Sequence, residues 1–213
     1  RFRDRVVHPA LCDALMPTLE YDALATSFAC RVGGGGLRAV HAVQRLLRAH
    51  RYALMLDVRH YFETAEHEVL LRLLFARIHD ARIRWLTETF VRHGAPGSPA
   101  GRGLPIGNLT SQHFANFMLG PLDRHLTSGL SLPVVRYMDD LVVFADDRES
   151  LWAAAGSAET FCARRLRLAL RAEVTRVVPS HEGVPFLGFR IFPGVVRFSG
   201  ERKRRWFRKM RAA

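Results

Sequence analysis

The chain has 213 residues, 48% of them hydrophobic, which is enough for one large domain or two small ones with a sizeable core. Its formal net charge of +12 predicts a polyanionic partner, for which nucleic acid is the first candidate. Three scattered cysteines exclude a disulfide framework, and no apolar run or leader predicts a membrane span or secretion, so we expect a cytoplasmic protein.

The first fifty residues predict helices around a run of glycines. Residues 3–19 are expected to form a loop and then a helix, with Arg3 and Arg5 at its start, and residues 27–31 a short strand. Four consecutive glycines at 33–36 predict a flexible turn that opens a helix over 37–50. A phosphate-binding loop is the weaker interpretation, because no Gly-Lys-Ser/Thr follows.

The next segment places an acid at the end of a strand. Residues 52–56 form an apolar run that predicts a buried strand ending at Asp57. Residues 58–64 are then expected to leave the sheet. Helical periodicity predicts helices over 66–78 and 83–93, followed by a glycine- and proline-rich loop over 94–103.

A second pair of acids lies between two apolar runs. Residues 104–112 lead into a helix predicted over about 111–126. Val, Tyr and Phe enrichment on both sides of Met138-Asp139-Asp140 then predicts two buried strands joined by a tight turn. Such a turn would hold two carboxylates at one point. The alternative is a solvated surface turn, which is our interpretation of the nearby Asp146-Asp147 pair.

The last third predicts a helix over 148–168, a strand over 170–178 and a second hairpin. This hairpin pairs residues 183–191 with 195–198 around Pro193-Gly194. The stretch from Gly200 to Ala213 contains seven Lys/Arg and one Glu, with apolar residues at helical spacing, which predicts a basic helix. Together the elements predict an α+β fold, with helices on one face of an antiparallel sheet.

If the strand of Asp57 lies beside the hairpin, three carboxylates converge from distant parts of the chain. Carboxylates so placed fit a site for two Mg²⁺ ions that holds the attacking and leaving oxygens of a phosphoryl transfer. Polymerases and nucleases share this chemistry, so the acids alone do not separate them.

Four segments, in order, resemble motifs of the reverse transcriptase family from near Arg1 to about Phe198. Residues 56–62 resemble the first metal-binding motif, 103–112 the nucleotide-pocket loop and helix, 137–140 the catalytic hairpin, and 186–189 the primer grip. The resemblance implies a right-hand polymerase with an antiparallel palm sheet backed by helices. It implies partial fingers over 1–51, a palm with finger-derived segments over 52–198, and the start of a thumb helix over 199–213, most of the thumb being absent.

The resemblance also implies a role for each site residue. Asp57, Asp139 and Asp140 would be catalytic and hold two Mg²⁺ or Mn²⁺ ions, with the carbonyl of Val58 as a further ligand. The steric gate under the nucleotide sugar would be Phe62, with Tyr61 as the neighbour that competes for this role. Further contacts to the nucleotide are expected from Ile106, Gly107, Ser111, Gln112 and Arg31. Contacts to primer or template are expected from Tyr137, Met138, Phe186, Leu187, Gly188, Arg3 and Arg5.

Two departures from the family pattern bear on the subclass. Ile106-Gly107 with Ser111-Gln112 replaces the Gln-Gly and Ser-Pro of many bacterial members, and resembles the diversity-generating retroelement class. An apolar Ile106 removes a hydrogen-bonding side chain from the pocket, so we hypothesise low fidelity. The resemblance implies a Lys-Thr pair whose Lys would donate a proton to pyrophosphate, but Val174-Thr175 stands at that place. The flanking Arg171 and Arg176 do not give up a proton at working pH, although they could neutralise phosphate charge.

The expected activity is RNA-templated addition of dNTPs to a primer 3′-hydroxyl. Expected partners are an RNA template, a DNA primer, dNTPs and a basic accessory protein of a retroelement, in a bacterial or phage-encoded system. One alternative keeps the fold in a group II intron-like or phage-defence protein that acts mainly as an RNA-binding module. A metal-dependent nuclease is the other alternative.

Overall fold

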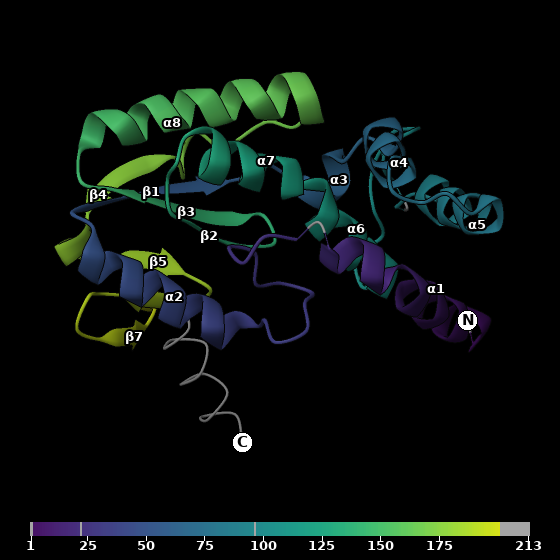
Figure 1. Cartoon of the computed structure of the whole chain (residues 1–213), viewed down its shortest axis with the longest axis horizontal. Helices are drawn as coiled ribbons and strands as arrows, with labels where there is room; N and C mark the ends of the chain where they lie inside the picture. The colour runs from purple at the N-terminus through teal and green to yellow at the C-terminus, as the bar shows by residue number, and fades with distance from the viewer. Residues whose placement is uncertain (1, 22, 96, 201–213) are drawn as a thin grey trace.

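The computed structural model describes residues 2–21, 23–95 and 97–200, with side chains from residue 6 onward. A four-stranded antiparallel sheet of order β2-β3-β1-β4 lies at its centre (Figure 1). Its strands are β1 (Tyr52–Asp57), β2 (Val134–Tyr137), β3 (Asp140–Ala145) and β4 (Arg176–Pro179). Successive side chains of a strand point to opposite faces. In β1, Leu54 and Leu56 therefore pack on one face and Ala53 and Met55 on the other.

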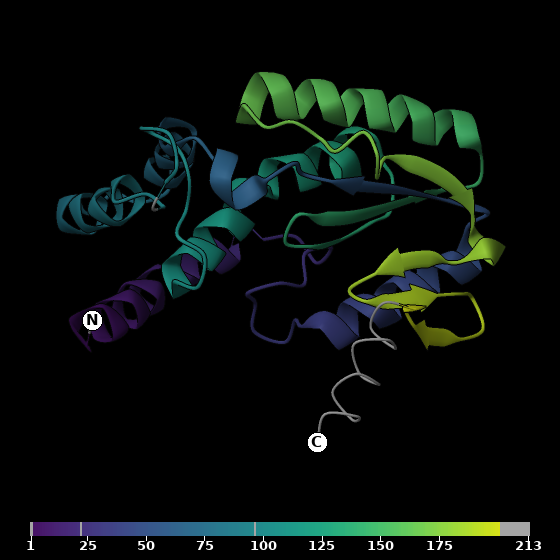
Figure 2. The same ribbon diagram turned by 180° about the vertical axis from the view of Figure 1, so that it is seen from behind.

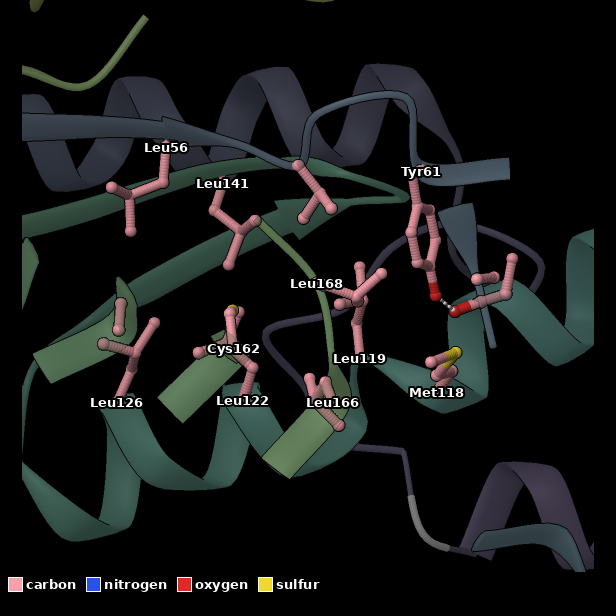
Figure 3. Packing of buried hydrophobic residues seen from close by; sticks show 14 of the residues in the cluster. Leu56, Tyr61, Met118, Leu119, Leu122, Leu126, Leu141, Cys162, Leu166 and Leu168 are labelled. Atoms are coloured by element: carbon pink, nitrogen blue, oxygen red, sulfur yellow. Dashed lines mark hydrogen bonds between the residues drawn. The ribbon is translucent and has the colours of Figure 1, made fainter. Parts of the chain in front are cut away.

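Helices of the middle of the chain cover the first face. They are α6 (Leu109–Met118), α7 (Gly120–Arg124) and α8 (Arg148–Phe161), with π-helical turns at His125–Gly129 and Cys162–Leu166. Figure 3 shows Leu56 and Leu141 of the sheet packing in one cluster with Leu122 and Cys162. The single helix predicted over 111–126 is divided near Pro121, which has no backbone N–H for a helical hydrogen bond.

The opposite face is covered by α2 (Gly36–Ala49) and by a second antiparallel sheet (Figure 2). This sheet contains β5 (Val184–Phe186), β6 (Phe189–Ile191) and β7 (Val196–Phe198), and follows a 3₁₀ turn at Ser180–Glu182. The sequence predicted helices on one face only. That prediction was wrong, because β1 and β3 are apolar on both sides and each side needs a cover.

A helical lobe extends from one end of the central sheet (Figures 1 and 2). It contains α1 (Phe2–Tyr21), α3 (Tyr61–Thr64), α4 (His67–Phe75) and α5 (Ala81–Arg92). The ring of His8 lies 2.7 Å from the Thr110 hydroxyl, which joins α1 to α6. The Asp80 carboxylate accepts hydrogen bonds from the first amides of α5 and fixes where that helix begins.

Four other local predictions differ from the structure. The loop expected at the start of residues 3–19 is helical, because α1 already begins at Phe2. Residues 27–31 form no strand, and only Ser27 makes an isolated bridge, with Arg136. Residues 171–175 turn, so β4 begins at Arg176. The predicted second hairpin has an additional turn at Leu187-Gly188, where both residues have positive φ, and this turn makes it three strands. The predicted basic helix from residue 201 lies outside the described residues.

Candidate active site

The acids of the two predicted motifs meet at the ends of neighbouring strands. β1 and β3 are antiparallel, and their register places Asp57 directly opposite Asp140. Directly opposed residues of an antiparallel pair have Cα atoms about 4.5–5.5 Å apart. The strand of Asp57 therefore lies beside the hairpin that carries Asp139 and Asp140. This was the condition under which the sequence predicted that the three carboxylates converge.

The turn that carries Asp139 is short and strained. Tyr137 pairs with Asp140, which leaves Met138 and Asp139 as a two-residue turn. Met138 has φ of 56°, in the left-handed region that L-residues with side chains disfavour. Its carbonyl accepts a hydrogen bond from Arg136 Nη1 at 2.9 Å, and this bond anchors the turn to strand β2.

A buried polar network, which the sequence analysis missed, supports this hairpin. Arg136 and Asp123 are each 1% exposed, and the guanidinium donates to both oxygens of the carboxylate at 2.7–2.9 Å. Arg136 Nη1 also donates to Asn116 Oδ1 at 2.7 Å. The network connects α6 and α7 to the hairpin that carries Asp139 and Asp140. A signal was present in the sequence, because an arginine beside Val135 in a buried strand requires a buried partner.

Burial raises the pKa of all three carboxyls, and repulsion by a neighbouring acid adds to this for Asp57 and Asp140. Burial is the largest cause for each, and the neighbouring acids raise the pKa of Asp140 further, to about 6. Arg171 acts in the opposite direction on each of them. Its Nη1 lies 2.9 Å from Asp57 Oδ2. The site is a cluster of partly buried acids whose contacting cation is an arginine.

The donor set suits a divalent cation in its chemistry. Asp57 Oδ2 is buried and accepts no well-directed hydrogen bond from the described residues, so it could serve as a ligand once Arg171 has moved. Two backbone bonds, Arg59 N–H to Ala169 O and Arg171 N–H to Asp57 O, flank Val58, so these bonds do not use its carbonyl. Among residues 2–21, 23–95 and 97–200, no three His, Cys, Asp or Glu side chains already have the arrangement of a metal site. The acids fit a metal, but here Asp57 pairs with Arg171.

The predicted sugar gate and its neighbour have different surroundings. Tyr61 is 2% exposed, and its hydroxyl donates a hydrogen bond to the Ala115 carbonyl (Figure 3). Phe62 is only partly buried against the same core. The Phe62 carbonyl accepts a hydrogen bond from Leu104 N–H at 2.6 Å, which ties this segment to the pocket loop. Of the two rings, only that of Phe62 is partly open to solvent.

The predicted pocket loop is exposed at its centre. Ile106 is 77% exposed, so it does not pack in the core, and Gly107 has φ of 96° with open space around it. At the start of α6, Ser111 is buried and Gln112 exposed. A cavity of about 420 Å³ lies along this loop, between Ile106, Leu104 and Glu63.

The predicted primer-grip turn lies beside the glycine run and the hairpin. A Cβ placed on Gly36 would lie 3.5 Å from Leu187 Cδ1 and 3.9 Å from Tyr137 Cε2. The glycine run, the primer-grip turn and the hairpin strand β2 therefore lie together, although the sequence analysis considered them as separate motifs. Phe186 is buried, and Gly188 has φ of 76°.

The predicted arginine contacts are placed less favourably. Arg31 donates to Glu20 and to the carbonyls of Leu24 and Ser27, so its guanidinium is engaged within the protein. The side chains of Arg3 and Arg5 lie outside the described ones. Contacts from these three residues to nucleotide or template stay predictions.

The chain matches the family model "Reverse transcriptase (RNA-dependent DNA polymerase)" over residues 4–191. It therefore belongs to the reverse transcriptase family. It is similar to Protein YkfC of Escherichia coli (strain K12), with 28% identity over 137 residues, which cover 58% of this chain and 35% of that protein.

The fold is similar to those of solved telomerases. Apo telomerase from Candida tropicalis, truncated from its C-terminal domain, has a TM-score of 0.63 and 12% identity, over 92% of this chain and 45% of that chain. Telomerase from Candida albicans, in complex with a TWJ fragment of telomeric RNA, has a TM-score of 0.64 and 10% identity, over 91% and 37%. The chain thus has a right-hand polymerase fold and spans less than half the length of each of these relatives. None of its described helices is long and apolar enough for a membrane span.

Proposed function

We propose that the chain is the fingers and palm of an RNA-directed DNA polymerase that adds dNTPs to a primer 3′-hydroxyl. The observation that carries the proposal is the pairing of Asp57 with Asp140 in a chain of the reverse transcriptase family. In this division residues 1–51 are partial fingers, 52–198 the palm and 199–213 the start of the thumb.

The metal of this site is proposed to be Mg²⁺, as two ions, with Mn²⁺ as a substitute. Asp57, Asp139 and Asp140 would hold the ions together with the Val58 carbonyl. When bound, the metal supplies charge stabilisation to the attacking and leaving oxygens. The protein's contribution is placement, because β1, β3 and the Met138 turn fix the carboxylates before substrate arrives.

Phe62 is proposed to select deoxynucleotides. Tyr61 is turned into the core and bonded to Ala115, which leaves Phe62 as the aromatic ring available to a sugar. A ring packed under the sugar leaves no room for a 2′-hydroxyl. Ile106 and Gly107, with Ser111 and Gln112, would form the pocket around the base.

The RNA partner is supported by charge and by likeness. A net charge of +12 favours binding to a polyanion. The Candida albicans telomerase, which has a similar fold, was solved in complex with RNA. We propose the diversity-generating retroelement class, with its basic accessory protein, on the strength of the Ile106 motif. A bacterial or phage protein of the cytoplasm fits this class.

Primer extension on an RNA template with a DNA primer, dNTPs and Mg²⁺ tests the proposal. We expect the full chain to extend the primer and Asp139→Asn to abolish extension, while Asp13→Asn, at an exposed aspartate of α1, keeps it. RNA binding without extension would favour the RNA-binding module. Cleavage without dNTPs that depends on Asp139 would favour the nuclease.

A further inference from the structure

Arg171 occupies a cation position at the acidic cluster. Its Nη1 lies 2.9 Å from Asp57 Oδ2, and its charge lowers the pKa of Asp139 and Asp140 as well as that of Asp57. Among the described residues, Arg136 is a second cation near the hairpin, and its guanidinium is bonded to Asp123, Asn116 and the Met138 carbonyl. Of these two arginines, Arg171 is the one that contacts an acid of the cluster from a partly exposed position.

The backbone of Arg171 is fixed while its side chain is not enclosed. Its N–H donates to the Asp57 carbonyl at 2.8 Å, and its own carbonyl accepts from Val174 N–H and Thr175 N–H at 3.1 Å. The side chain is 43% exposed, compared with 10% for that of Asp57. The guanidinium can thus rotate away from Asp57 without any change in the chain path.

The neighbouring arginine on the same surface is paired differently. Arg59 donates to Glu173 at 2.8 Å, so an acid from outside the cluster neutralises it. Arg176 lies on β4 opposite Met55, two residues before Asp57 in β1. Of these three arginines, Arg171 is the one whose partner is a proposed metal ligand.

We propose that Arg171 is a displaceable counterion of the active site, which holds Asp57 until metal and nucleotide enter and then turns outward to bind the nucleotide triphosphate. The proposal rests on the polymerase function proposed above. It also assigns a role to an arginine that flanks Val174-Thr175, the pair that replaces the family Lys-Thr.

The physical argument is one of exclusion. A divalent ion would bind Asp57 Oδ2 at about 2.0–2.1 Å. A guanidinium on the same oxygen would repel that ion, because both carry positive charge. Metal binding and the Arg171–Asp57 pair therefore compete. Once displaced, the planar guanidinium can donate two parallel hydrogen bonds to phosphate oxygens while keeping its proton.

Binding of Mn²⁺, measured by electron paramagnetic resonance without RNA or nucleotide, tests the first half. We expect Arg171→Gln to bind Mn²⁺ about 5-fold or more tightly than the unchanged chain, a coupling of ordinary size. Arg171→Lys should fall between them. Arg176→Gln removes the same charge from the neighbouring strand and should change the affinity far less. Thermal unfolding checks that each variant folds.

Binding of inorganic triphosphate in the presence of saturating Mn²⁺ tests the second half. Arg171→Gln should weaken it, although the metal is held more tightly, and Arg176→Gln should not. Equal Mn²⁺ affinity in Arg171→Gln and the unchanged chain, or an equal gain in Arg176→Gln, would overturn the counterion role alone. Absence of Mn²⁺ binding in every variant would overturn this role together with the proposed polymerase site.

Discussion

Arg136 and Asp123 form an ion pair closed to solvent, in which two guanidinium nitrogens contact the carboxylate at 2.7–2.9 Å. The same guanidinium donates to the Met138 carbonyl in the turn that carries Asp139. Arg136 therefore makes two kinds of bond, an ion pair with Asp123 and a hydrogen bond to the Met138 carbonyl. Mutations can distinguish the effect of the ion pair on stability from the effect of the Met138 bond on activity.

Replacing only Arg136 by Met leaves the Asp123 carboxylate buried without its partner. We expect a loss of about 3–5 kcal/mol in the free energy of unfolding, measured by urea denaturation. The double variant Arg136→Met/Asp123→Leu should recover most of this stability. Primer extension should stay low in it, because the Met138 turn has lost its donor. Full recovery of extension would show that the pair serves stability only.

Tyr61 and Phe62 form a matched pair for testing the sugar gate. Phe62→Val should increase incorporation of ribonucleotides relative to deoxynucleotides, because room appears for a 2′-hydroxyl. Tyr61→Phe removes the hydrogen bond to the Ala115 carbonyl and should lower stability by about 0.5–1.5 kcal/mol without changing sugar selectivity. Competition of rNTP with dNTP in primer extension measures the sugar selectivity of both variants, and urea denaturation measures their stability. The reverse outcome would assign the gate to Tyr61.

The raised pKa of Asp140 predicts a pH dependence of stability. Its carboxyl has a pKa of about 6, against an ordinary value of 3.8, so the folded state binds this proton more tightly than the unfolded chain. The stabilisation is fully present below pH 3.8 and is lost as the pH rises through 6. Asp140→Asn should flatten the fall in unfolding free energy over this window. Urea denaturation with a chelator present measures it, and an unchanged slope would contradict the prediction.

Ile106 offers a direct test of the low-fidelity hypothesis. Because the side chain is 77% exposed, Ile106→Gln should change the free energy of unfolding by less than about 0.5 kcal/mol. We expect it to alter the misincorporation spectrum in primer extension, since an amide can bond the incoming nucleotide. Val195→Gln also replaces an exposed aliphatic side chain by an amide, at a position distant in sequence from the predicted pocket. An unchanged spectrum in Ile106→Gln would reject the hypothesis.

Strong local signals account for what the sequence could predict. The β1 run, the hairpin around Asp139 and most helices follow from apolar periodicity, and these elements carry the acids. The convergence of Asp57 with the hairpin depended on the strand order, which the sequence left as a condition and which the β1–β3 pairing supplies. Periodicity alone would not have placed β1 beside β3.

The remaining features depend on contacts between distant segments. Nothing near Arg136 in the sequence indicates Asp123 or Asn116 as its partners, because the three meet only after α6 and α7 pack on the sheet. The contact of Arg171 with Asp57 likewise depends on the turn after residue 168 passing beside Val58. Positive φ at Leu187 was equally hidden, since nonglycine residues seldom adopt it.

The alternating side chains of β1 limit which changes in chain length this protein can tolerate. Loss of one residue within Tyr52–Asp57 would exchange the two sets of apolar side chains between the faces of the sheet. The same deletion would move the terminal acid out of line with Asp140. Insertions and deletions among related chains should therefore be absent from this strand and collect in loops such as residues 94–103, where neither the cores nor the carboxylates depend on the count.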